Sequence, residues 1–171
     1  HPVAYEHQNK LTEQDIRKMI EESNFDGIEA NYIYIDYNRN RIDDIEKWNI
    51  KEVCAHNARF DYNSLNNTQR WTTKSRFRYF LPYGLEWWDT LKMARSVMGK
   101  MPTYQRFCAE NGYTTKTGKP RFTAEICYRF ITKDNTFVES HTGLEDVEIE
   151  TEILRYCHKQ HKAMKKKLWE K

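Results

Sequence analysis

The sequence of 171 residues lacks several features that would assign it to a common class. No apolar segment approaches the ~20 residues of a transmembrane helix, so we expect no membrane association through a span. No signal peptide is recognisable. No glycine-rich loop follows an expected strand, which argues against a dinucleotide site. Low-complexity linkers and internal repeats are also missing.

The sequence has only four cysteines, and their spacing does not match that of a zinc site. The four residues, none in a Cys-x-x-Cys pair, are Cys54, Cys108, Cys127 and Cys157. A zinc site built on such a pair is therefore not expected. Their mostly apolar or helical surroundings predict buried free thiols and a reducing compartment, the cytoplasm.

Charge is nearly balanced, with 28 Lys and Arg against 25 Asp and Glu. The net charge of +3 permits nucleic-acid binding without arguing for it. Hydrophobic residues make up 39%, enough for the core of one domain. Because the chain begins at His1 rather than Met, we expect a trimmed or rearranged N-terminus.

Hydrophobic periodicity predicts alternating helices and strands. Helices are expected over 11–24, from near Phe60, and over 91–98, 104–110, 124–131 and 144–160. Strands are expected over 28–37, 50–55 and 87–88. This alternation predicts an α/β domain. We divide the chain into an N-terminal α/β segment (1–49), a central region (50–161) and a basic C-terminal tail (162–171).

The first chemical motif is Ala-His-Asn-Ala-Arg-Phe-Asp at 55–61, where a strand ends and a helix begins. Sites in open α/β sheets form at this edge. Asp61 falls in the first helical turn. Its carboxylate either points into a cleft or only interacts favourably with the helix N-terminus.

The second motif is His-Thr-Gly-Leu-Glu-Asp at 141–146. It places an imidazole and a carboxylate beside one helix N-terminus. Asp146 is suited to a divalent ion, and His141 to deprotonating a metal-bound water. The alternative is an ordinary loop histidine followed by an acid in a first turn.

Together the motifs resemble a known family. His-Asn-x-x-Phe-Asp, then Asp-Thr-x-x-x-Ala-Arg at 89–95, then His-x-x-x-x-Asp is the order of the DEDD-type 3′–5′ exonucleases, His subtype. These include polymerase proofreading subunits and small phage exonucleases. The resemblance covers about residues 50–155. It implies a ribonuclease-H-like α/β fold and phosphodiester hydrolysis with two Mg²⁺ or Mn²⁺ ions.

The resemblance also implies roles for individual residues. Asp61 and Asp146 match metal ligands, and His141 matches the general base. Asn57 and Phe60 match the substrate side of the site, although the ring of Phe60 is expected in the core rather than on the substrate.

The chain departs from this family at its first motif, an Asp-x-Glu at a strand end that supplies two ligands. The nearest segment is Ile-Tyr-Ile-Asp-Tyr-Asn at 33–38. Asp36 is either a metal ligand or a turn residue at a strand end. The N-terminal part of the sheet is therefore expected to be incomplete or rebuilt.

Residues 1–29 are weakly similar to part of the polymerase-and-histidinol-phosphatase phosphoesterases. The match consists of His1-Pro2, a helix, and Phe-Asp-Gly-Ile-Glu at 25–29. This match suggests a fragment or a fusion, and we assign no activity to it.

Basic and aromatic residues alternate over 70–80, a mixture that suits single-stranded nucleic acid. Arg76 and Arg78 are the candidate contacts. The alternative is a solvated helix with a core stripe at Phe77 and Phe80. The lysines of the tail predict a solvated helix end, or contact with a nucleic-acid backbone.

The sequence thus predicts a metal-dependent 3′–5′ exonuclease acting on single-stranded DNA or frayed DNA 3′ ends, in a bacterial or phage-infected cell. The alternative is a catalytically inactive derivative that binds nucleic acid or a protein partner, such as a phage inhibitor of host machinery. A third option is that a partner chain or another segment completes the site.

Overall fold

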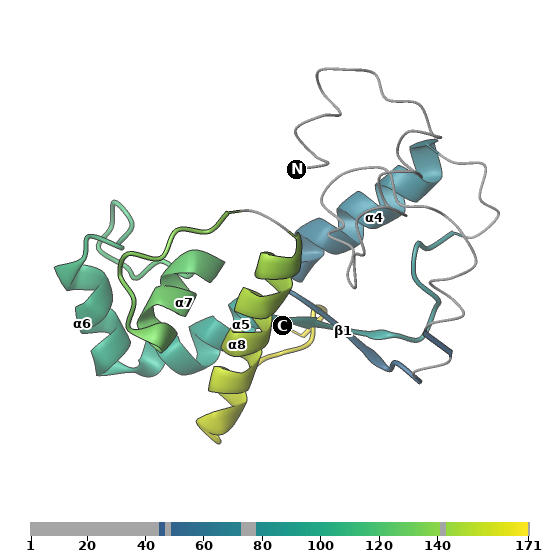
Figure 1. The fold of residues 1–171 in the computed structure, drawn as a ribbon. Helices are drawn as coiled ribbons and strands as arrows, with labels where there is room; N and C mark the ends of the chain where they lie inside the picture. Colours follow the sequence, from purple (N-terminus) through teal and green to yellow (C-terminus); the bar gives the residue numbers. More distant parts are fainter. Residues whose placement is uncertain (1–44, 47–48, 73–77, 141–142, 171) are drawn as a thin grey trace, which may run out of the picture.

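The computed structural model describes residues 45–46, 49–72, 78–140 and 143–170 (Figure 1). Strands β1 (Glu52–Ala55) and β2 (Glu86–Asp89) form a parallel two-stranded sheet. Glu52 lies opposite Glu86, and Ala55 lies opposite Asp89. The two strands therefore end side by side. The predicted α/β class is confirmed, whereas the predicted helix over 11–24 and strand over 28–37 lie outside the described residues.

The predicted helices over 91–98, 104–110, 124–131 and 144–160 match the observed ones to within about two residues at their ends, and the helix predicted from near Phe60 begins at Ala58. They are α4 (Ala58–Thr72), α5 (Thr90–Val97), the short 3₁₀ helix η1 (Met98–Lys100), α6 (Pro102–Glu110), α7 (Ala124–Thr132) and α8 (Gly143–Lys159). No helix within the described ranges is both long and apolar enough to cross a membrane.

Local sequence explains where several of these helices begin. The Asp89 carboxylate caps α5 by accepting hydrogen bonds from the backbone N–H groups of Leu91 and Lys92. The Thr123 hydroxyl caps α7 in the same way. Pro102 occupies the first turn of α6, where its missing N–H costs no hydrogen bond. These residues therefore define where α5 begins, directly after β2, and where α6 and α7 begin.

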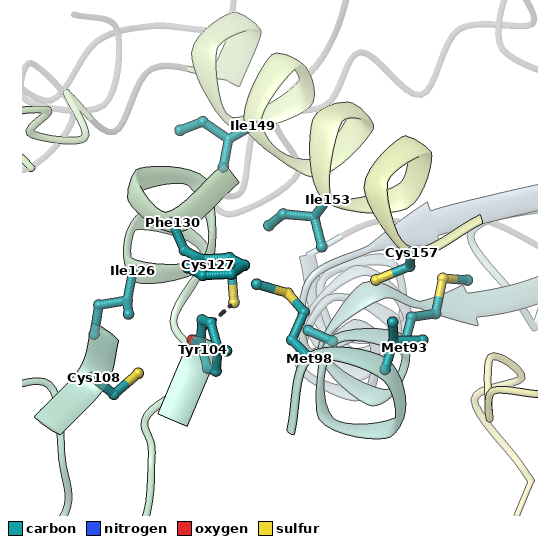
Figure 2. Close-up of a cluster of buried hydrophobic side chains, with 12 residues drawn as sticks. Met93, Met98, Tyr104, Cys108, Ile126, Cys127, Phe130, Ile149, Ile153 and Cys157 are labelled. Carbon is teal, nitrogen blue, oxygen red and sulfur yellow. Dashed lines mark hydrogen bonds between the residues drawn. The ribbon is translucent and has the colours of Figure 1, made fainter. Parts of the chain in front are cut away.

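One hydrophobic cluster joins α5, α6, α7 and α8 (Figure 2). Tyr104 is fully buried at its centre, and its hydroxyl donates to the carbonyl of Arg121 over 2.6 Å. The predicted buried free thiols are confirmed for Cys108, Cys127 and Cys157. Burial raises the pKa of Cys127 and Cys157 to about 12, so both remain protonated and unreactive.

A second cluster lies on the other side of the sheet. Because successive strand side chains point to opposite faces, Val53 and Trp87 lie on the face that packs against α4. Trp88 lies on the opposite face, packs against the first cluster, and stacks on His158 of α8 with ring centroids 6.0 Å apart. Both faces of the two strands are therefore covered by helices.

The C-terminal tail differs from its prediction. Residues 162–170 are not a solvated helix end, because α8 ends at Lys159 and the chain returns to the sheet. Lys167 pairs with Trp88 in an antiparallel bridge, and the N–H of Leu168 donates to the carbonyl of Trp87 over 2.8 Å. Leu168 is only 3% exposed. Burial of this leucine, which the lysine-rich pattern conceals, docks the tail against β2.

Candidate functional site

The candidate site begins where β1 and β2 end. Asn57 has a positive φ of 67°, a conformation that asparagine tolerates better than most residues. This turn directs its N–H to Oδ1 of Asp89 at 3.1 Å. The same oxygen caps α5. Asp89, 4% exposed, therefore ties the two strand ends together and has a structural role.

His56 is a second structural link. Its Nε2 lies 2.8 Å from the carbonyl oxygen of Phe122, and its Nδ1 lies 2.9 Å from the hydroxyl of Thr90. A carbonyl only accepts, so Nε2 carries the proton and Nδ1 accepts from Thr90. Burial lowers the pKa of His56, which keeps the ring neutral. The imidazole is thus occupied on both sides and unavailable as a base.

The backbone of His56 connects to an acidic residue that the motifs do not include. Its N–H donates to Oε1 of Glu150, on α8, over 2.8 Å. Burial first, and then the negative charges of Asp61, Asp146 and Glu139, raise the pKa of Glu150 to about 7, although the hydrogen bond from the His56 N–H acts to lower it. At neutral pH this carboxyl is therefore close to half protonated.

Glu150 lies close enough to both predicted metal ligands, Asp61 and Asp146, for their charges to affect its pKa. Asp146 is one turn before it on α8, and Asp61 is in the first turn of α4. Figure 1 shows the first turns of these two helices close together beside the sheet. We call Asp61, Asp146 and Glu150 the acidic cluster. Its members come from two helices that are far apart in sequence: Asp61 from α4, and Asp146 and Glu150 from α8.

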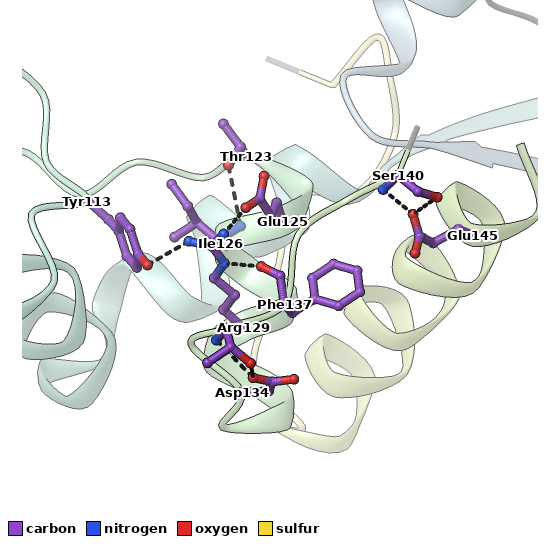
Figure 3. Close-up of polar contacts among 10 residues, drawn as sticks. Tyr113, Thr123, Glu125, Ile126, Arg129, Asp134, Phe137, Ser140 and Glu145 are labelled. Atoms are coloured by element: carbon purple, nitrogen blue, oxygen red, sulfur yellow. Dashed lines mark hydrogen bonds and ion pairs between the residues drawn. The ribbon is translucent and has the colours of Figure 1, made fainter. Parts of the chain in front are cut away.

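The connection from α7 to α8 is held by polar contacts (Figure 3). Arg129 donates to the carbonyl of Phe137 over 2.7 Å and to the hydroxyl of Tyr113 over 2.6 Å, and it pairs with Glu125. At the far end, the Glu145 carboxylate accepts from the N–H and the hydroxyl of Ser140. Ser140 is thereby attached to the first turn of α8.

The remaining predicted site residues have mixed outcomes. Asn57 is exposed beside the acidic cluster. The prediction that Phe60 belongs to the core is wrong, because its side chain is 56% exposed at the start of α4. Arg78 is exposed, with its guanidinium 5.4 Å from the centre of the Tyr79 ring. Asp36, Arg76 and His141 lie outside the described residues.

Two residues with central positions were missed in the sequence. His56 belongs to the motif His-Asn-x-x-Phe-Asp, but its structural role could not be predicted, because its partners, Thr90 and Phe122, are distant in sequence. Glu150 did carry a signal, since it follows Asp146 by four residues and must share its helix face.

A cleft of about 920 Å³ lies next to the acidic cluster, because its lining includes His56, whose N–H donates to Glu150, and the neighbouring Asn57. Its walls are the outer face of α5 with η1, and the loop before α7. Four cationic side chains line it: Arg95, Lys100, Lys119 and Arg121. No acidic side chain is among the described residues that line it. We call this the basic cleft.

The acidic cluster has the donor chemistry that Mg²⁺ and Mn²⁺ prefer, namely carboxylate oxygens. One oxygen of Asp146 is buried, and the pKa of Glu150 is raised first by burial and then by the neighbouring negative charges, which a bound cation would offset. In the part of the chain that the structure describes, no three Asp, Glu, His or Cys side chains are arranged to hold a metal ion. The charge thus fits a metal, while the described side chains do not complete a coordination shell.

Comparisons with protein-family models, curated proteins and solved structures find no match to this chain.

Proposed function

We propose that the protein is a metal-dependent 3′–5′ exonuclease that hydrolyses single-stranded or frayed DNA. The observation that carries the proposal is the convergence of Asp61 and Asp146 on Glu150. The first two are the carboxylates that the family resemblance selects as metal ligands. A pattern drawn from separate motifs thus coincides with one electrostatic cluster at the carboxyl edge of a parallel sheet.

In this proposal Asp61 and Asp146 hold Mg²⁺ or Mn²⁺, and Glu150 is the additional carboxylate. The ion, when bound, would polarise the scissile phosphate and lower the pKa of the attacking water. His141 would accept the proton from that water, and Asp36 would supply a further ligand. Arg76 and Arg78 would contact the substrate, as would Asn57 and the exposed ring of Phe60.

The charges of the site explain why a metal is needed. A phosphodiester is anionic, so the acidic cluster repels it until a cation lies between them. His56 stabilises the arrangement without entering the chemistry, because both ring nitrogens already hold hydrogen bonds to protein groups. The adjoining basic cleft attracts the rest of the substrate.

The test is digestion of 3′-labelled single-stranded DNA with Mg²⁺ or Mn²⁺, with EDTA as the chelator control. We expect metal-dependent release of labelled mononucleotides, lost in Asp146→Asn. The matched control is Glu148→Gln, a charge removal at an exposed position of the same helix, which leaves the rate unchanged. Metal-independent digestion, or none by folded protein, contradicts the proposal. DNA binding in EDTA without turnover in either ion supports the alternative of an inactive binding module.

A further inference from the structure

The basic cleft gives the protein a strand-binding surface separate from the acidic cluster. Arg95 extends from α5, Lys100 ends η1, and Lys119 and Arg121 lie in the loop before α7. All four side chains are exposed. None of them forms an ion pair with an acid in the described part of the chain. Their positive charge is therefore available to a ligand.

The backbone around these cations is held independently of their charged groups. The carbonyl of Arg121 accepts from the Tyr104 hydroxyl, and its N–H donates to the carbonyl of Tyr113 over 2.9 Å. Thr114 and Pro120 form an antiparallel bridge that closes the loop. Substitution of the cationic side chains therefore leaves these fold contacts intact.

The lining of the cleft also includes the apolar residues Leu91, Pro120 and Phe122. Phe122 is fixed by stacking on Tyr104, with ring centroids 5.2 Å apart. Cationic and apolar side chains in one cleft suit a polymer with anionic phosphates and exposed base faces. A duplex keeps its base faces inside and would leave the apolar side chains without a partner.

We propose that the basic cleft binds the phosphodiester backbone of a single-stranded nucleic acid and holds it beside the acidic cluster. This inference rests on the proposed function, since it places the substrate strand of the proposed nuclease. His56 and Asn57 line the cleft, and the N–H of His56 donates to Glu150, so a strand held in the cleft lies next to the acidic cluster.

The test measures binding without turnover. The probe is a fluorescein-labelled oligothymidylate of about 15 nucleotides, followed by fluorescence anisotropy in EDTA. Four phosphate contacts predict a slope of about −2.8 in log affinity against log salt, which is roughly a fiftyfold loss of affinity between about 50 and 200 mM.

The variant Lys119→Gln with Arg121→Gln removes two of the four cations. Its slope should fall to about −1.4, so the same salt increase weakens binding only about sevenfold. The matched control is Lys116→Gln, in the same loop but outside the cleft lining, and it should behave as wild type. Circular dichroism of all three proteins confirms equal folding.

Equal slopes for the double variant and wild type would overturn the proposal, as would an equal loss in Lys116→Gln. Displacement of the probe by thymidine monophosphate at the same concentration as by the unlabelled oligonucleotide would also overturn it, because the cleft would then bind a small phosphate ligand rather than a strand. Binding as predicted, together with no metal-dependent digestion, would refute the nuclease and leave the strand site standing.

Discussion

Replacement of Glu150 by glutamine tests whether burial and the neighbouring carboxylates disfavour the ionised form of this residue as the structure indicates. The pKa of this carboxyl rises from 4.5 in its ordinary state to about 7 in the folded protein. Between these values the folded state binds more protons than the unfolded state. The free energy of unfolding therefore falls as pH rises from about 4.5 to 7. Above pH 7 the carboxyl is ionised and the full loss of stability has been reached.

The shift corresponds to roughly 3 kcal/mol of unfavourable interaction for the ionised carboxylate. Glutamine carries no charge, and its side-chain oxygen can still accept the N–H of His56. Relative to the difference between the two proteins at pH 4.5, Glu150→Gln should gain up to about 3 kcal/mol in unfolding free energy at pH 8.

The assay is urea denaturation of wild type and Glu150→Gln from pH 4.5 to 8, without divalent metals. Glu148→Gln, at an exposed position of α8, is the matched control and should show no such pH-dependent gain. A constant difference between Glu150→Gln and wild type over the whole pH range would refute the reasoning, since the carboxyl would then have an ordinary pKa.

Three further predictions concern the metal, His56 and the tail. Saturating Mn²⁺, at about 100 times its Kd, should raise the unfolding free energy of wild type by about 2.7 kcal/mol but not that of Asp146→Asn; equal stabilisation of both in thermal unfolding would exclude Asp146 as a ligand. His56→Ala should cost about 2–3 kcal/mol in urea denaturation at pH 8, because it leaves buried partners unsatisfied. That cost should shrink as pH falls below 6.5, since the folded state disfavours protonated His56. A cost that grows in acid would contradict the lowered pKa of this histidine. Leu168→Ala should cost about 2–5 kcal/mol and Lys162→Ala almost nothing; equal values would show that the tail is not docked.

Much of the central fold could be predicted from local sequence. The helix periodicity from Leu91 onwards, and the strand ending at Asp89, depend on neighbouring residues that the chain displays directly. The docked tail could not be predicted, because Leu168 and its partner Trp87 are far apart in sequence and the surrounding lysines suggest solvent. Local charge thus concealed a contact that only tertiary structure reveals.

Those residues of the candidate site that belong to recognisable motifs could be predicted from the sequence. Asp61 and Asp146 follow from their motifs and from the family resemblance, and in the structure the charges of both act on Glu150. The exposure of Phe60 was missed because an aromatic ring in a helix beside a strand is usually buried. The basic cleft was missed because its four cations come from three segments and form no run in the sequence.

The most direct test of the central claim is the rate of mononucleotide release from 3′-labelled single-stranded DNA in Mg²⁺ by wild type, Asp61→Asn and Asp146→Asn. Because the two carboxylates act on one site, we predict that each variant loses at least roughly a hundredfold in rate while remaining folded. Each variant should also still bind single-stranded DNA in EDTA. Activity close to that of wild type in either variant would contradict the assignment of α4 and α8 to a shared metal site.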